Sequence, residues 1–251
     1  MLSRTNVSSR IAKAVTIVEG HVAKVSKVAS AVTQSAVKSI NEEYSMNLSK
    51  VVAGERINLS KAQAGVNKYA VGLEWNPKAG VTADCDISII LLDANGKVIP
   101  GTNGPNKPKC MCYYGQLELP GVKSYGDNQD GSDDAFATPT GNDEQIDIDL
   151  SKFSSEVAQV VVVASTHSET GVALPFGRVA SPVLTIFSNE GSRPDPKYFF
   201  EMDEDFSTAT SVEVAKFYRR GADWSYVSMA DVVGTDAMGL QGIVSKYGIT
   251  S

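Results

Sequence analysis

The chain has 251 residues, of which 42% are hydrophobic, enough to bury one sizeable core or to form one domain with an appendage. Its net charge of −6 at pH 7 argues against nucleic-acid binding by the body of the protein. No run approaches the roughly 18 consecutive apolar residues that a membrane-spanning helix needs. We therefore expect a protein without a transmembrane segment.

Residues 1–45 differ in composition from the rest of the chain. They contain six basic and three acidic side chains, a net charge of +3, which leaves −9 on residues 46–251. Apolar or small residues recur at alternating intervals of four and three between Ile11 and Ala36, a pattern typical of a heptad seam. We predict a basic amphipathic helical arm over residues 1–45. It either packs on its own domain or, through residues 11–40, builds a homo-oligomer or a larger assembly with protein partners.

From Met46 onward the pattern changes to that of β-strands. The β-branched and aromatic runs are separated by turns rich in Gly, Pro, Asn and Asp. The predicted strands cover residues 68–75, 84–93, 144–150, 157–166, 182–187, 197–203, 211–220 and 224–229. Eight strands without intervening helices predict an all-β sandwich or barrel. A short C-terminal helix is expected at 237–248, over one end of the strands. The tetrapeptide "NLSK", at 47–50 and again at 58–61, predicts two further short strands.

The residues that carry most enzyme chemistry are sparse in this sequence. His167 is the only histidine after residue 45, and there is no phosphate-binding loop and no zinc-protease motif. Three cysteines are an odd number, and the spacing of Cys110 and Cys112 is wrong for the usual structural zinc pair. We predict reduced, non-ligating thiols in a reducing compartment and a function that is not enzymatic.

An acidic segment, "GDNQDGSDDAFATPTGNDE", occupies residues 126–144. It holds six carboxylates and no basic side chain, with glycines that allow the backbone to bend. Asp84 and Asp86 add two more carboxylates, which alternation places on one face of a predicted strand. Hard cations such as Ca²⁺ prefer carboxylate, amide and carbonyl oxygens. From these residues alone, a solvated loop and a cation-binding site both remain open.

Several motifs, in order, resemble the tellurium-resistance TerD family. They begin with "MNLSKVVAGERINLSKAQAGVNKYAVGLEWNP" at Met46 and continue through "DCDISIILLDANGKV" and "SYGDNQDG…GNDEQIDIDLSKF". "VVVVASTHSE", "PFGRVASPVLTIF", "MDEDFSTATSVEVAKFYRRGADWSYVSM" and "GLQGIVSKYGI" follow, so that the resemblance covers residues 46–251. It implies a TerD-like, two-sheet β-sandwich domain over those residues, preceded by the helical arm.

The resemblance also implies a calcium site. The family takes its calcium ligands from an Asp-x-Asp strand and from a Gly-Asp-Asn…Asp-Asp-Glu loop. The matching residues here are Asp84, Asp86, Asp127, Asn128, Asp143 and Glu144, for one or two Ca²⁺ ions. The chain differs from the family pattern in having Asn76 after Trp75 and a longer loop with an insertion near residues 132–140, so one of the two ions is expected to be weakened or lost.

These expectations combine into a functional hypothesis. The resemblance implies a calcium-binding, non-enzymatic stress-response module that binds protein partners in the bacterial cytoplasm. The alternative is a structural or decoration subunit of a phage virion or another large assembly, with the helix at 11–40 as its assembly handle.

Overall fold

A computed structural model describes residues 49–50, 66–76, 83–101, 107–129, 131, 138–167, 172–191, 195–235 and 238–249. The predicted arm at 1–45, with its proposed assembly segment 11–40, lies outside the described residues. The second repeat strand, at 58–61, lies outside them as well. The first repeat contributes a short strand, β1, at Ser49–Lys50.

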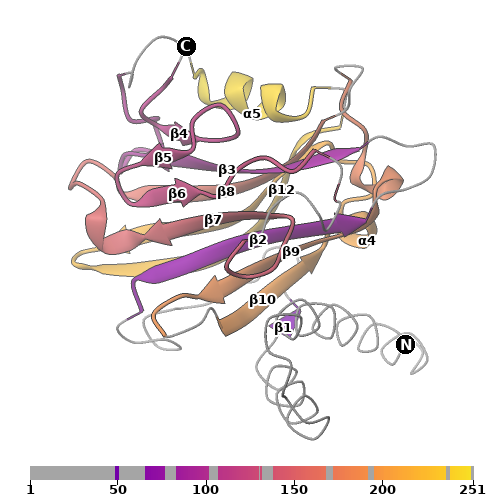
Figure 1. Cartoon of the computed structure of the whole chain (residues 1–251). Coiled ribbons are helices and arrows are strands. Elements are labelled where there is room, and N and C mark those ends of the chain that lie inside the picture. The colour runs from indigo at the N-terminus through magenta and orange to yellow at the C-terminus, as the bar shows by residue number, and fades with distance from the viewer. Residues whose placement is uncertain are drawn as a thin grey trace, which may run out of the picture.

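Two β-sheets make up the described part of the chain (Figure 1). The larger sheet has the order β1-β10-β9-β2-β7-β6-β5, and the smaller has the order β12-β11-β8-β3-β4. The strands of the larger sheet not yet located are β2 (Lys68–Asn76), β5 (Glu118–Leu119), β6 (Val122–Ser124), β7 (Glu144–Asp149), β9 (Ala180–Ser188) and β10 (Asp195–Glu201). Those of the smaller sheet are β3 (Asp84–Leu92), β4 (Met111–Cys112), β8 (Gln159–His167), β11 (Ser211–Arg220) and β12 (Asp223–Gly234). Neighbouring strands are antiparallel except for β1 and β10, and the predicted two-sheet β-sandwich is confirmed.

The main core fills the space between the two sheets. Side chains alternate along each strand, so β3 sends Cys85, Ile87 and Ile89 into this core. Its other face carries Ile90 and Leu92, which belong to a second, smaller apolar cluster. Because β3 is buried on both faces, its sequence is an almost continuous apolar run after Asp86.

The C-terminal helix α5 (Leu240–Tyr247) covers the outer face of the smaller sheet (Figure 1). Its Ile243 is fully buried against Ile90 of β3 and Val161 and Val163 of β8. The sequence correctly predicted a short helix here, but its position differs from the expectation. It packs on a face of the sandwich, not over an end, because the outward-facing apolar residues of β3 and β8 need a cover.

The strand predictions are confirmed for all eight runs, with local differences. Strand β7 ends at Asp149, one residue before the predicted end at residue 150. The short 3₁₀ turn η1 (Leu150–Lys152) follows it. Strand β10 ends at Glu201, and a single helical turn, α4 (Met202–Asp205), follows where the prediction continued the strand to residue 203. A second 3₁₀ turn, η2, spans Phe176–Arg178. Strands β4, β5 and β6 were missed, because two or three residues are too few to show a period.

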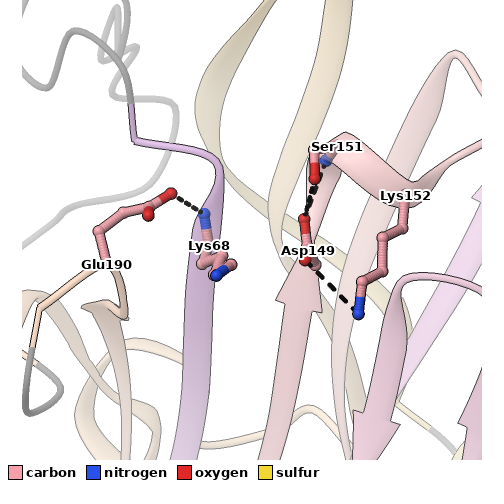
Figure 2. Close-up of polar contacts among 5 residues, drawn as sticks. All are labelled: Lys68, Asp149, Ser151, Lys152 and Glu190. Atoms are coloured by element: carbon pink, nitrogen blue, oxygen red, sulfur yellow. Dashed lines mark hydrogen bonds and ion pairs between the residues drawn. The ribbon is translucent and has the colours of Figure 1, made fainter.

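Polar contacts fix the ends of the central strands of the larger sheet (Figure 2). The Glu190 carboxylate accepts from the backbone N–H of Lys68, at the start of β2. Asp149, at the end of β7, accepts from the backbone N–H of Ser151 and pairs with Lys152. Lys68 and Asp149 are register partners, so both sets of contacts close the same end of the sheet. The opposite end of β2 and β7 is where the acidic loop lies.

Candidate metal centre

The acidic residues gather beside the first half of β3. Strand β4 pairs with β3 only at Ile89 and Ile90, so in the described part of the chain the stretch before them lacks a strand neighbour on that side. Glu144, the first residue of β7, reaches across from the other sheet. Its carboxylate accepts a hydrogen bond of 2.9 Å from the backbone N–H of Ile87. The first half of β3 is thus joined to the larger sheet by an acidic side chain.

Three carboxylates converge at this place. Asp84, Asp86 and Asp127 each bring one carboxylate oxygen to within 4.8 Å of the other two. Asp84 and Asp86 project from the same face of β3, and Asp127 comes from the segment that follows β6. Asp86 is buried, whereas Asp84 and Asp127 are partly buried. The structure therefore brings together residues that are more than 40 positions apart in the sequence.

Burial and like charge make the ionised form of these groups costly. Burial raises the pKa of Asp86 well above its usual range, and the charges of Asp84 and Asp127 raise it further. Burial likewise raises the pKa of Glu144, as do the charges of Asp86, Asp127 and Asp84, against the opposing effect of the Ile87 N–H. A bound cation would remove this repulsion, because it favours the ionised carboxylates.

Asn128 and Asp143 take part in hydrogen bonds that shape the loop. Asp143 accepts a 2.9 Å hydrogen bond from the backbone N–H of Trp75, and Asn128 accepts one of 3.0 Å from Gly131. Gly131 has φ of +68°, and a Cβ there would lie 2.6 Å from the Trp75 Nε1. Only glycine allows the loop to approach the indole this closely. The Asp143 and Asn128 side chains thus hold the backbone on both sides of the carboxylate cluster.

The structure adds residues that sequence reasoning missed. Tyr114, in the turn after β4, is 56% exposed, and the charges of Asp86, Asp127 and Asp84 contribute to its raised pKa, after burial as the largest cause. Sequence reasoning placed Gly131 in the loop and Trp75 near the site, but it did not predict that the two residues contact each other. The contact was not predictable from local sequence, since it joins two segments that are distant along the chain. Asp130, Asp133 and Asp134 of the acidic segment lie outside the described residues.

His167 and the cysteines occupy different environments. His167 is exposed at the end of β8, where it is the register partner of Asp84. Cys85, Cys110 and Cys112 are free and buried. Burial raises the pKa of Cys112 to about 12 and that of Cys85 well above its usual value. These thiols stay protonated at neutral pH, and thiolate is the form that reacts or binds metals.

The chemistry of the cluster suits a hard divalent cation. All of its side-chain ligand atoms are oxygens, which Ca²⁺ prefers. The Asp127 Oδ1 is buried and has no hydrogen-bond partner in the described part of the chain. No ion pair between described residues neutralises Asp86, Asp127 or Glu144. The free Asp127 oxygen, and the absence of a described ion pair at the buried Asp86 and Glu144, fit an ion such as calcium.

Comparisons with known proteins agree with this architecture. A family described as the TerD domain matches residues 45–247. This chain belongs to the TerD family. Among its relatives are stress response protein SCP2 of Bacillus subtilis (strain 168), 29% identical over 209 residues, 77% of this chain and 96% of the relative. Tellurium resistance protein TerD of Serratia marcescens is 28% identical over 211 residues, 82% of this chain and 99% of that protein.

A solved structure shows the same TerD fold. The crystal structure of a homologue of telluride resistance protein (TerD) from Streptomyces coelicolor A3(2) superposes with a TM-score of 0.54 at 17% identity, covering 71% of this chain and 96% of that one. The matched region begins at residue 45, so the first 44 residues precede the TerD domain. Within the described residues of this TerD-family chain, no helix is both long and apolar enough to cross a membrane.

Proposed function

We propose that the protein is a calcium-binding, non-enzymatic module of a bacterial stress response. The observation that carries the proposal is the convergence of Asp84, Asp86 and Asp127 within 4.8 Å, with the buried Glu144 beside them. Two relatives named for stress response and tellurium resistance support the stress-response setting. In this proposal, Asp143 and Asn128 position the loop, as their hydrogen bonds to Trp75 and Gly131 suggest.

Bound calcium would neutralise the carboxylates and join β3 to the loop after β6. The chain's own contribution is to hold these groups in place before the ion arrives. Glu144 is fixed by the Ile87 N–H, and the loop is fixed against Trp75. A preformed set of ligands reduces the ordering cost of binding. The module would therefore respond to calcium with a gain in rigidity at one end of the sandwich, where partners can detect it.

Fluorescence of Trp75 offers a direct test of calcium binding at this place. The chain has two tryptophans, and Trp224 lies elsewhere, against Phe153 and Arg219. In a Trp224→Phe background, calcium should change the emission of Trp75 with a half-point of ~10⁻⁷ to 10⁻⁵ M, the range of sensor sites. Asp127→Ala and Asp84→Ala should each weaken the response, and Asp133→Ala, in the insertion, should weaken it less. An emission spectrum that stays constant up to millimolar calcium would contradict the proposal.

The alternative of a virion or other assembly subunit depends on residues 1–45, which lie outside the described residues. No observation of the described domain favours it over the stress-response module. It remains a prediction that the oligomeric state of the full chain tests.

A further inference from the structure

A line of polar residues crosses the outer face of the smaller sheet. Asp86 of β3 is the register partner of Ser165 of β8, and Ser165 is the register partner of Ser211 of β11. Ser88, two residues after Asp86, projects from the same face. Further along this face the side chains become apolar, with Ile90 and Val161 under α5. We call Ser88, Ser165 and Ser211 the hydroxyl row.

All three serines of the hydroxyl row are fully buried. Each has 0% exposure, and within the described residues none of their hydroxyl oxygens has a hydrogen-bond partner. By contrast, the hydroxyl of Ser228, a buried serine of β12, donates to the Met229 carbonyl. A buried hydroxyl without a partner is unfavourable, because it loses its hydrogen bonds to water and gains none in return. Three such groups near one another on one face of the sheet indicate that something else completes their hydrogen bonds.

Two glycines leave space around the hydroxyl of Ser211. Gly234 of β12 is the register partner of Ser211, and a Cβ at this glycine would lie 2.7 Å from the Ser211 Oγ. Above the sheet, a Cβ at Gly242 of α5 would lie 3.4 Å from the same oxygen. Glycine on both sides keeps side chains away from Ser211. At the other end of the row, the carboxylate of Asp86 offers strong acceptors.

We propose that the hydroxyl row binds ordered water, and that this water hydrogen-bonds to the Asp86 carboxylate and supplies water ligands to the cation. A water between Asp86, Ser165 and Ser88 would have three protein partners, the usual number for a buried water. Calcium commonly keeps water among its six to eight oxygen ligands. The second half of this inference rests on the proposed calcium function, whereas the bound water does not.

The row would also join the carboxylate cluster to the C-terminal helix. Asp86 and Ser211 are two strands apart, and Ser211 lies beneath Gly242 in the first turn of α5. Ordered water between them forms a continuous hydrogen-bonded path under the helix.

A crystal structure of the full chain, grown with chelator, tests the first half directly. We expect water density within hydrogen-bonding distance of the Ser165 and Ser211 oxygens. Direct serine–backbone bonds, or a dry contact at these oxygens, would overturn the proposal. Because the crystals contain no calcium, this result is independent of whether the cation site is real.

Thermal unfolding in chelator gives a second, independent measurement. If the row holds water, Ser165→Ala and Ser211→Ala should each lower the melting temperature by about 2–4 °C, and the double variant should lose less than the sum. Ser228→Ala is the control for replacing a buried serine that already has a protein partner. If the row is dry, each substitution removes an unpaired buried hydroxyl, and an unchanged or higher melting temperature would refute water binding.

Calcium titration then separates the two halves of the inference. Ser165→Ala should weaken calcium binding by about five- to tenfold if its water serves the ion. Ser228→Ala should leave the affinity unchanged. If the crystal shows the water but Ser165→Ala binds calcium with unchanged affinity, the role in cation binding is refuted and the water site stands. Absence of calcium binding by the unmodified chain would instead refute the proposed function.

Discussion

Asp86 is a residue at which the acidic site is costly to the fold. It is buried, and its neighbours Asp84 and Asp127 carry the same charge. A charged side chain in such a place destabilises the fold unless a cation or a proton neutralises it. A fold that keeps this residue ionised for a cation is therefore less stable when the cation is absent, the compromise that metal-binding sites often show.

Asp86→Asn should have opposite effects with and without calcium. In chelator, removal of the buried negative charge should raise the melting temperature by about 2–4 °C, which corresponds to roughly 1 kcal/mol for a chain of this size. In calcium, the variant should lack the stabilisation that the unmodified protein gains. Asp223→Asn, at an exposed position at the start of β12, is the control and should change neither value. Equal destabilisation of Asp86→Asn in both conditions would show that Asp86 has only a structural role.

The raised pKa values of Asp86 and Glu144 predict how stability depends on pH. The metal-free fold binds protons at these carboxyls more tightly than the unfolded chain does. Their contribution to stability is complete below the ordinary carboxyl pKa of about 4 and is lost as the pH rises through the raised values. In chelator, the melting temperature of the unmodified protein relative to that of Asp86→Asn should therefore fall as the pH rises above the ordinary carboxyl range. A difference that stays constant as the pH rises would contradict the prediction.

The stabilisation by calcium should increase with pH, whereas the contribution of the protonated carboxyls to stability decreases. Protons and the ion compete for the same carboxylates, so the stabilisation by calcium should be small at pH 5 and larger at pH 8. Melting curves at fixed calcium concentration measure this difference. Stabilisation that does not depend on pH would point to an ion bound away from Asp86 and Glu144.

At the scale of elements, β3 shows what the sequence can and cannot predict. Alternation of Asp84 and Asp86 with Cys85 and Ile87 predicted both the strand and the shared face of the two carboxylates, because the period of a strand is local. The hydrogen bond from Ile87 to Glu144 was not predictable in this way. It depends on how two sheets are placed against each other and on β4 ending short.

The position of α5 on the sheet was also not predictable from the sequence. The local pattern predicts the length and type of α5. Its position depends on Val161 and Val163 of β8, which face outward beneath it. Four consecutive valines show no alternation, so the sequence does not indicate which of them face outward. The acidic loop was identified from composition, and its link to β3 came from family resemblance. The hydroxyl row needed the register of three strands, which only the structure supplies.

The attachment of α5 to the sheet gives a prediction at this scale. Glu213 of β11 is buried and accepts from both Lys246 and Tyr247 of the helix. Lys246→Ala should lower the free energy of unfolding by about 2 kcal/mol, since it leaves a buried carboxylate without its cation. Lys152→Ala, which breaks an exposed 3.7 Å pair with Asp149, is the control and should cost about 0.5 kcal/mol or less. Urea denaturation measures both.

A compensating change shows whether the loss arises from the charge. Glu213→Gln keeps an acceptor for Tyr247 but removes the buried negative charge. In the Lys246→Ala background it should restore part of the lost stability. Further destabilisation by Glu213→Gln would show that the helix depends on the shape of the contact and not on its charge.

At the scale of the whole molecule, a basic segment precedes an acidic domain. Residues 1–45 carry a net charge of +3 and the remainder −9. The first described strand, β1, lies directly after this segment and is held by an ion pair of 2.5 Å between Lys50 and the buried Glu201 of β10. Strand β1 is thus fixed to the edge of the larger sheet.

Light scattering of the full chain and of residues 46–251 tests the predicted role of the segment. If residues 11–40 build an assembly, the full chain should form a defined oligomer and the truncated chain should be a monomer. If the protein is a stress-response module with a free arm, both chains should have the same oligomeric state. An oligomer that survives the truncation would place the interface on the β-sandwich instead.

Isothermal titration calorimetry of the full chain with calcium is the most direct test of the central claim. We predict saturable binding with a dissociation constant of ~10⁻⁷ to 10⁻⁵ M. Asp127→Ala should weaken this binding at least about tenfold, and Asp223→Ala should leave it unchanged. Absence of binding heat at two temperatures, or equal affinity in Asp127→Ala and the unmodified chain, would contradict a calcium site at Asp84, Asp86 and Asp127.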